Sequence, residues 1–315
     1  MRIAIAGAGG VGGLLGGLLA RAGNEVVILA RGAHGEAIRR DGLRVASPLG
    51  SFTARVEAVS GDAARLGPAE AVLVAVKAWQ VADLAPSLAP LLAKGGIAVP
   101  FQNGVEAAGR LAAALGDARV AGGLVSVLAW IEGPGQVKHM GGPPRVKIGA
   151  RAAGQAAPLE ALAGALRGAG AVVDVVEDVE RASWEKFLFI EPWGAVASVA
   201  RAPLGVVRSV PETRALLVRA QEELVAVARA RGVALPADAV AKTLPALEGF
   251  PAESTSSMQR DLGAGRPSEL EDQVGAVVRL AREAGVPVPV HETILAALRP
   301  QESAARGAIP RFERT

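Results

Sequence analysis

The sequence predicts an α/β protein, with an N-terminal Rossmann domain built on a doubly wound, mainly parallel sheet and an all-α C-terminal domain. Three observations lead to this prediction. Short, continuous apolar runs alternate with helical stretches in the N-terminal part, as in a parallel sheet covered on both faces. A glycine-rich turn directly follows the first of these runs. Beyond Val176 the strand-like runs end and helical patterns take over, so we expect domains at 1–177 and 178–315.

The elements of the N-terminal domain follow from apolar runs that are bounded by Gly, Asn and Pro. The pattern predicts strands at 2–6, 25–30, 71–76 and 96–100 and helices at 11–22, 80–93 and 105–115. From residue 120 it changes to strands separated by Gly- and Pro-rich turns at 133–135 and 141–144. A helix at 158–169 and a strand at 171–176 complete the domain.

The C-terminal domain shows only helical periodicity. We expect helices at 182–200, 212–231, 238–247 and 268–284, and a polar, frayed tail after Pro300.

Length and composition exclude several classes of protein. The chain has 315 residues, of which 50% are hydrophobic and 21% are charged, so it is not intrinsically disordered. It contains no Cys, which excludes a disulfide framework, a thiolate metal site and a Cys nucleophile and suits a reducing compartment. The pI is near 9.7 but the net charge is only +3, with no basic patch in the sequence, so we expect no nucleic-acid partner.

The uncharged segment at residues 3–20 has the length of a membrane span. Seven of its residues are Gly, and a strand, a glycine turn and a helix account for it. We therefore expect a cytoplasmic protein without a membrane segment. The three His (His34, His139 and His291) lack the spacing of metal ligands, so we expect no metal, and we interpret His139 as a structural residue.

A G-x-G-x-x-G pattern marks the expected cofactor site. It lies between a predicted strand and a predicted helix, which is the context that dinucleotide binding requires. Gly7 permits a tight turn, Gly9 lets the backbone approach a pyrophosphate, and Gly12 allows close packing of the helix on the strand. Gly10 and Val11 begin the helix, whose N-terminal N–H groups and dipole favour phosphate.

The end of the second strand indicates which dinucleotide binds. NAD enzymes place Asp or Glu there to bind the ribose hydroxyls. This chain has Arg31 instead, and the first acidic residue after the strand is Glu36. A guanidinium suits a 2′-phosphate, so we predict NADP, although a solvated surface arginine is the ordinary alternative.

Six short motifs occur in an order that resembles the ketopantoate reductase (2-dehydropantoate 2-reductase) family over nearly the whole chain. They lie at residues 7–12, 76–80, 102–104, 184–186, 256–258 and 265–271. The resemblance implies reduction of a 2-keto acid by NADPH, with a Rossmann domain, a helical domain and an active site between them.

The resemblance also implies roles for single residues. Lys186 matches the family's general acid, and Glu269 matches the carboxylate that holds the hydroxyl end of the substrate. Asn103 matches a residue that orients the nicotinamide and the lysine. Lys77 matches a residue near the NADP phosphates, and Ser257 matches a hydroxyl that binds the substrate carboxylate.

The chemistry of Lys186 is reasonable apart from any family. Hydride transfer to a ketone leaves an alkoxide, and an ammonium within reach both polarises the carbonyl and delivers the proton. Structural roles remain open for these residues: a surface lysine on a helix, a charged helical turn at Glu269, and an Asn-Gly turn at Asn103.

Three positions depart from the family pattern. Ile190, Gly194 and Val274 stand where the resemblance implies Asn side chains that contact the substrate. A site that loses hydrogen-bond partners loses discrimination by large factors. We therefore predict an NADPH-dependent 2-keto acid reductase and keep, as the nearest alternative, a paralogue that reduces a less polar keto acid or ketone.

Two further alternatives stay open. A nicotinamide-binding redox sensor would need the glycine motif but neither Lys186 nor Glu269. A dehydrogenase of the hydroxy-acid type would have Asn at position 190. The apolar helices of the C-terminal domain could pack in a homodimer, but a monomer core explains them equally well.

Overall fold

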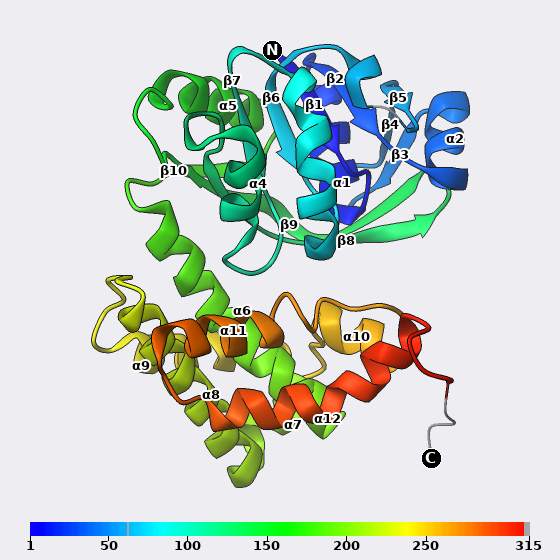
Figure 1. The fold of residues 1–315 in the computed structure, drawn as a ribbon. Coiled ribbons are helices and arrows are strands. Elements are labelled where there is room, and N and C mark those ends of the chain that lie inside the picture. Colours follow the sequence, from blue (N-terminus) through cyan, green and yellow to red (C-terminus); the bar gives the residue numbers. More distant parts are fainter. Residues whose placement is uncertain (62, 312–315) are drawn as a thin grey trace. The chain divides into compact units, whose positions relative to one another are not determined.

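A computed structural model describes residues 1–61 and 63–311 of the chain (Figure 1). Contacts along the chain divide it into two compact units, Met1–Val179 and Glu180–Thr315. The first unit contains the strands, and the second, as far as residue 311, is built from helices and loops.

The first sheet of the N-terminal unit is parallel and five-stranded, with strand order β5-β2-β1-β6-β7. Its strands are β1 (Arg2–Ala6), β2 (Glu25–Leu29), β5 (Glu57–Val59), β6 (Ala69–Val74) and β7 (Leu92–Pro100). The order reverses between β1 and β6, which is the switch point where open α/β sheets bind ligands.

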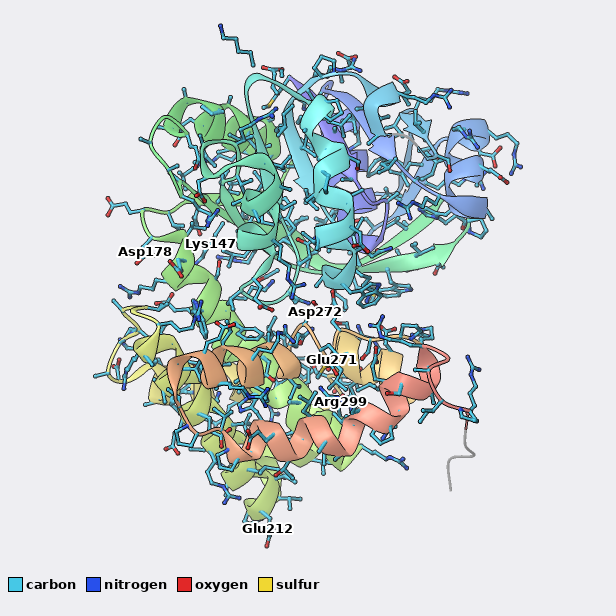
Figure 2. All side chains as sticks on the ribbon, in the orientation of Figure 1. Lys147, Asp178, Glu212, Glu271, Asp272 and Arg299 are labelled. Carbon is cyan, nitrogen blue, oxygen red and sulfur yellow. The ribbon has the colours of Figure 1, made fainter. Side chains whose placement is uncertain are left out.

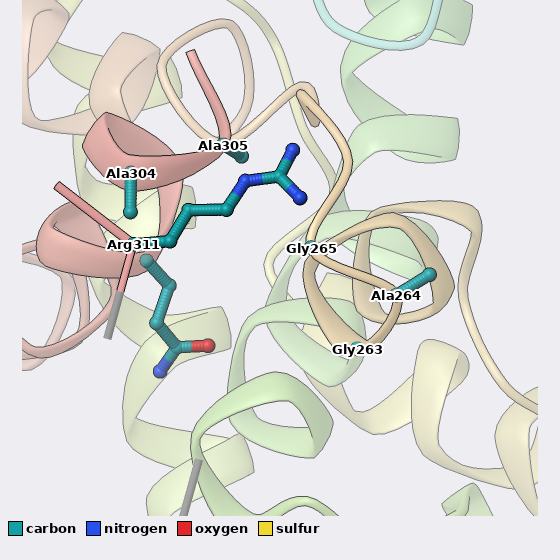
Figure 3. A pocket seen from close by; sticks show the side chains of 7 residues that line it. Gly263, Ala264, Gly265, Ala304, Ala305 and Arg311 are labelled. Atoms are coloured by element: carbon teal, nitrogen blue, oxygen red, sulfur yellow. The ribbon is translucent and has the colours of Figure 1, made fainter. Parts of the chain in front are cut away.

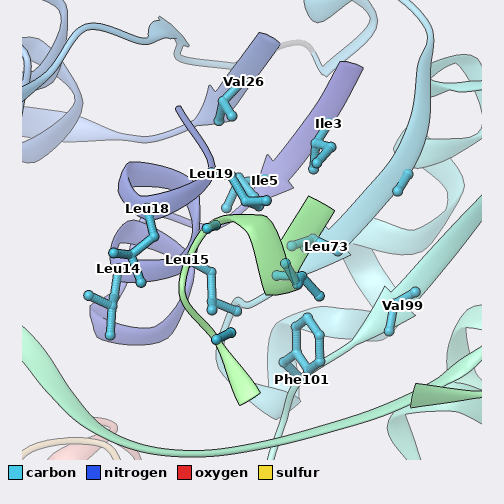
Figure 4. Close-up of a cluster of buried hydrophobic side chains, with 14 of the residues drawn as sticks. Ile3, Ile5, Leu14, Leu15, Leu18, Leu19, Val26, Leu73, Val99 and Phe101 are labelled. Carbon is cyan, nitrogen blue, oxygen red and sulfur yellow. The ribbon is translucent and has the colours of Figure 1, made fainter. Parts of the chain in front are cut away.

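Both faces of this sheet are covered, which explains the continuous apolar runs. Alternate residues of β1, such as Ile3 and Ile5, pack against α1 (Gly10–Arg21) in one cluster, which also includes α5 (Ala156–Gly168) (Figure 4). The residues between them, such as Ala4, face a second cluster. That cluster is formed by α3 (Val81–Leu84), the 3-10 segments η1 (Ala63–Leu66) and η3 (Ala85–Leu91), and α4 (Ala107–Leu115).

A second, mixed sheet has the order β10-β9-β3-β4, with β8 paired to β9. Its strands are β3 (Leu43–Ala46), β4 (Phe52–Ala54), β8 (Gly122–Gly133), β9 (Gln136–Gly149) and β10 (Val172–Val175). The remaining regular elements of this unit are α2 (Gly32–Asp41), η2 (Ala78–Gln80) and η4 (Asp117–Arg119).

The C-terminal unit begins within α6 (Val179–Ala200). The other helices are α7 (Leu204–Ser209), α8 (Pro211–Ala230), α9 (Ala239–Glu248), α10 (Ser257–Gly263), α11 (Val274–Ala284) and α12 (Pro289–Ala305). Helices α8, α11 and α12 pack on one another through buried apolar faces.

The predicted fold class is confirmed, but four local predictions were wrong. Residues 80–93 do not form one helix, because Pro86 and Pro90 lack the N–H that an α-helix needs; they form short α3, then η3, and β7 begins at Leu92. The expected turn at 141–144 lies inside β9. A register shift between Ser126 and Leu128 of β8 accommodates it.

The other two corrections concern the C-terminal unit. The helix expected at 268–284 begins only at Val274, and residues 269–273 form bends and turns. The tail is not frayed after Pro300, since α12 continues through this proline to Ala305. Both regions take part in a buried, long-range contact that local periodicity does not reveal, since Ser268 of the loop donates two kinds of hydrogen bond to Glu302 of α12.

The sequence pattern did not reveal several elements, namely the short β3, β4, β5, α7 and α10, the ten-residue α2 and the 17-residue α12. Most of them are short or carry mixed polarity, so their periodicity is weak.

Candidate active site

The register of the parallel sheet brings the ends of four strands together. Leu29 of β2, Ala6 of β1, Val74 of β6 and Pro100 of β7 form one row across the sheet. Every predicted site residue of the N-terminal unit lies in the segment that follows one of these strand ends, within six residues of the row. They are Gly7, Gly9, Gly10, Val11, Gly12, Arg31, Lys77 and Asn103.

The glycine turn has the backbone that the motif predicts. Gly7 adopts φ +107°, and its N–H donates to the carbonyl of Leu29 at 3.2 Å. A Cβ on Gly12 would overlap the carbonyl oxygen of Gly7, so only glycine lets α1 lie this close to the turn. Gly9 is the N-cap of α1, and no side chain caps the helix.

The first turn of α1 carries no acidic residue. A Cβ added to Gly9 would have the carbonyl oxygen of Ala75, at 3.8 Å, as its nearest neighbour, so the space beside this backbone is open. An uncapped N-terminus with free approach to its backbone suits a pyrophosphate. The residues present therefore fit a dinucleotide.

Arg31 and Lys77 flank this turn on the neighbouring strands. Arg31 is the exposed N-cap of α2, and the first turn of that helix also lacks acidic residues. Lys77 is partly buried, its N–H donates to Oε1 of Gln80 at 3.2 Å, and its ammonium lies 5.7 Å from the ring centroid of Trp79. Both cations follow strand ends, where an anionic cofactor binds.

Gln102 is a site residue that sequence reasoning missed. Its amide nitrogen donates to the carbonyl oxygens of Val74 at 3.0 Å and Val76 at 2.9 Å, and it is buried. These bonds tie the segment after β7 to the segment after β6, and they set the backbone that carries Asn103, which is partly buried. The amide of Gln102 in the motif at 102–104 was the available signal.

In the C-terminal unit, Lys186 and Glu269 interact although 82 residues of chain separate them. Lys186 is partly buried in α6, and Glu269 is 7% exposed in the loop before α11. Loss of solvent lowers the pKa of the Lys186 ammonium from 10.5 to about 8, and the charge of Glu269 opposes this shift. An ammonium with a pKa near 8 is protonated at neutral pH and gives up its proton readily.

Ser257 begins α10, next to a residue that caps the helix. Ser256 is the N-cap, and its Oγ accepts the N–H of Gln259 at 3.0 Å. This cap fixes the backbone direction at Ser257, which is partly buried.

The three positions that depart from the family pattern differ in their surroundings. A Cβ on Gly194 would lie 3.2 Å from Oγ of Ser256 and 3.9 Å from Cε of Met258, so side chains of α10 already occupy the space beside it. Val274 is completely buried, and Ile190 is partly buried. None of the three offers a hydrogen bond from its side chain.

A buried charge cluster joins three helices and was not predicted. Nδ1 of His291 lies 2.6 Å from Glu223, and its Nε2 lies 3.0 Å from Glu191. Burial alone would lower the pKa of His291, but the two carboxylates outweigh this effect and raise it to about 9. The buried imidazole is therefore charged at neutral pH.

His139 has the surroundings of a structural residue. It is buried, its Nδ1 lies 2.9 Å from Oγ of Ser47, and its Nε2 lies 3.1 Å from the carbonyl oxygen of Gly142. Burial lowers its pKa, against the bond to Gly142. Both nitrogens are therefore bound within the protein, Nδ1 by the residue that follows β3 and Nε2 by a carbonyl of β9.

Two hollows lie elsewhere. One of about 280 Å³ lies between the ends of α10 and α12, where the guanidinium of Arg311 extends toward the turn at Gly265 (Figure 3). The other lies around the start of β7, at Leu92 and Lys94. Neither is lined by a predicted site residue.

Residues 1–61 and 63–311 contain no group of three or more His, Asp or Glu that could hold a metal ion. Within the same residues, no helix has both the length and the apolar character needed to cross a bilayer.

Two features are typical of a nicotinamide-dependent oxidoreductase that acts on C=O and CH–OH groups. One is the parallel sheet with a glycine turn at its switch point, and the other is a lysine whose lowered pKa is opposed by the charge of a carboxylate. Comparison with known proteins supports this class. The family model for "Ketopantoate reductase PanE/ApbA" matches residues 3–153, and the model for its C-terminal domain matches residues 178–302. The chain belongs to the ketopantoate reductase family.

Individual relatives match nearly the whole chain. A 2-dehydropantoate 2-reductase of Halobacterium salinarum is 32% identical over 93% of this chain and 96% of its own length. An uncharacterized oxidoreductase of Bacillus subtilis, YkpB, is 29% identical over 96% of this chain and 99% of its own length.

Solved structures agree with the fold. The crystal structure of a PanE/ApbA family ketopantoate reductase from Ralstonia eutropha JMP134 has 34% identity and a TM-score of 0.88, over 97% of this chain and all of the other. A ternary D-mandelate dehydrogenase structure with NADH and anilino(oxo)acetate has a TM-score of 0.89 over 97% of this chain and 99% of its own, and at 20% identity it shows the fold alone.

Proposed function

We propose that this protein is an NADPH-dependent reductase of a 2-keto acid, with Lys186 as general acid. The observation that carries the proposal is the pair of Lys186, whose pKa is lowered to about 8, and the nearly buried Glu269. An ammonium that is charged at neutral pH but easily deprotonated can both polarise a carbonyl and supply a proton.

The residues that would hold the cofactor are Gly7, Gly9, Gly10, Val11, Gly12, Arg31, Lys77 and Asn103. The chemistry that NADPH would supply at this site is hydride donation to the carbonyl carbon. Lys186 would give a proton from Nζ to the carbonyl oxygen, so that the product is a 2-hydroxy acid and the lysine is left as a neutral amine. Glu269 orients the substrate and favours the charged form of Lys186, while Ser257 binds the substrate carboxylate.

Arg31 supports NADPH over NADH. Its guanidinium is exposed beside the N-terminus of α2, and no acidic residue stands in the first turn to repel a 2′-phosphate. An arginine fork can bind such a phosphate with two parallel hydrogen bonds.

A second candidate substrate is a less polar keto acid or ketone. Gly194 lies against Ser256 and Met258, and Val274 is completely buried, so neither position presents an amide to a substrate.

The decisive experiment follows NADPH absorbance with purified protein, ketopantoate and a panel of 2-keto acids that differ in side-chain polarity, with Lys186→Ala as the control. Turnover of ketopantoate that depends on Lys186 would establish the proposed activity. Turnover of an apolar keto acid alone would favour the second candidate. Tight NADPH binding without turnover of any carbonyl would contradict both and favour a redox sensor.

A further inference from the structure

Glu269 lies in a loop, and the residue before it is held unusually firmly. Ser268 is completely buried, and its N–H donates to both carboxylate oxygens of Glu302, at 3.1 and 3.0 Å. Its hydroxyl donates to Oε2 of the same carboxylate at 2.6 Å. Its carbonyl oxygen accepts the guanidinium of Arg306 at 2.9 Å. All three polar groups of Ser268 are therefore bound by Glu302 of α12 and by Arg306, the residue that follows α12.

The acceptor of these bonds is itself a buried charge. Glu302 is 2% exposed, and its Oε1 accepts Nε of Arg306 at 2.6 Å, one helical turn along α12. The carboxylate thus binds a cation, a hydroxyl and a backbone N–H. Charge-assisted bonds of this kind are shorter and stronger than those between neutral groups.

The same contacts reach across Glu269. The N–H of Leu270 donates to Oγ of Ser268 at 3.2 Å, so the backbone is tied on both sides of Glu269. The carbonyl of Glu269 accepts the N–H of Gln273 at 2.9 Å. Because the chain is bound before and after it, the backbone that carries the Glu269 side chain has little freedom to move.

Stability alone does not explain such a cluster. A buried ion pair replaced by apolar residues of similar volume often leaves a protein as stable or more stable, whereas buried polar groups can fix one local conformation. The segment fixed here carries Glu269, the carboxylate whose charge opposes the lowering of the pKa of Lys186.

We propose that Ser268, Glu302 and Arg306 form a clamp that positions Glu269 beside Lys186. The three are positioning residues, since they act through Glu269. The importance of the clamp for turnover rests on the function proposed above, but its effect on Lys186 does not.

The test compares Glu302→Gln with Arg299→Ala. The Gln side chain of Glu302→Gln keeps one carbonyl oxygen as acceptor, but its NH₂ group faces donors of Ser268 or Arg306. We therefore expect the hydrogen bonds that hold Ser268 to be broken. Arg299 also joins α12 to this loop, through Glu271 at 3.0 Å, but that pair is on the surface, with side chains 55% and 40% exposed (Figure 2). It controls for the loss of an ion pair between the same helix and the same loop.

The first readout needs neither cofactor nor substrate. Acetylation of Lys186 by acetic anhydride, followed by peptide mass spectrometry across a pH series, gives the pH at which the amine deprotonates. Glu269 raises the pKa of Lys186, so its displacement lowers that pH. Glu269→Gln, which removes the charge itself, gives the full downward shift of the acetylation midpoint of Lys186. We expect Glu302→Gln to produce a large part of that shift and Arg299→Ala to leave the midpoint unchanged.

The second readout is kinetic, with whichever keto acid the protein reduces. Misplacement of a catalytic group by about 1 Å can cost about 100-fold, so we expect a fall of up to this size in kcat for Glu302→Gln and an unchanged dissociation constant for NADPH. If no carbonyl is reduced, the proposed function fails while the labelling result still decides the clamp.

Ser268→Ala provides a milder variant in case Glu302→Gln does not fold, because it removes only the hydroxyl. It should lower the midpoint of Lys186 by a smaller amount, and Ser268→Thr should restore it. A folded Glu302→Gln or Ser268→Ala protein whose thermal midpoint falls while the Lys186 midpoint stays at the wild-type pH would overturn the proposal.

Discussion

At the scale of single residues, the proposed mechanism depends on Lys186, whose pKa is lowered to about 8. Nothing in the sequence fixes how buried Lys186 is, and Glu269, which opposes the shift of its pKa, comes from a loop 83 residues further on. Sequence could identify the residue through its motif. The pKa of its ammonium is a property of the folded C-terminal unit.

The lowered pKa predicts a pH dependence. Turnover needs the protonated amine, so kcat should be constant below the pKa and should fall tenfold per pH unit once pH rises above about 8. Steady-state kcat at saturating substrate, measured across this range, checks the prediction. Lys186→Ala should lose about 100- to 10,000-fold at neutral pH. A profile of the wild-type enzyme that stays flat to pH 10 would rule out Lys186 as the proton donor.

Arg31 gives a second prediction at this scale. A charge-assisted contact contributes about 1.5–3 kcal/mol, so Arg31→Ala should weaken NADPH binding about 10- to 150-fold and leave NADH binding unchanged. Isothermal titration with both cofactors measures this. Arg39 is exposed in the last turn of the same helix, and Arg39→Ala is the matched control. Equal losses for NADPH and NADH would show that Arg31 does not read the 2′-phosphate.

At the scale of elements, glycine sets the contact between α1 and the sheet. A Cβ on Gly12 would overlap the backbone of Gly7, and it would lie 2.9 Å from the Cβ of Ala75 and 3.1 Å from Ile5. These neighbours are backbone and buried core, which cannot move cheaply.

Gly12→Ala should therefore destabilise the protein by about 1–3 kcal/mol and weaken NADPH binding, because α1 must shift away from the turn. Gly164→Ala is the control, since this glycine lies exposed in α5 with nothing within 4 Å of an added Cβ. Alanine there should stabilise the protein by about 0.5–1 kcal/mol. Urea unfolding of the three proteins tests both signs, and a Gly12→Ala protein as stable as wild type would refute the packing argument.

At the scale of the whole molecule, stability should change with pH through His291. Its imidazolium joins α12 to α6 through Glu191 and to α8 through Glu223. The pKa is about 9 in the folded protein and 6.5 in the unfolded chain. The folded state thus binds the proton more tightly, and the extra stability is complete below pH 6.5 and lost as pH rises through 9.

The loss amounts to about 3 kcal/mol, and urea unfolding at a series of pH values measures it. Lys186 acts in the opposite direction, since its lowered pKa makes the folded state release a proton from about pH 8 upward. The difference between the unfolding free energies of wild type and His291→Gln cancels the contribution of Lys186, because both proteins contain this lysine. If the difference in stability between wild type and His291→Gln is the same at pH 6.5 and pH 9, His291 is not charged in the folded protein.

Sequence alone determined the fold class and the cofactor turn. Continuous apolar strands and a G-x-G-x-x-G turn are local signals, because each reports on residues within one turn or one strand. The family motifs also gave Lys186, Glu269 and Ser257 as candidates.

Tertiary structure decided what the local signals could not. Gln102 binds carbonyls 26 and 28 residues away, Glu302 anchors Ser268 from 34 residues away, and His291 lies between two distant carboxylates. α11 begins only at Val274 and α12 continues beyond Pro300, and the contact between Ser268 and Glu302 joins these two regions. Burial and long-range partners set these outcomes, and the chain brings them together only when the helices and strands pack.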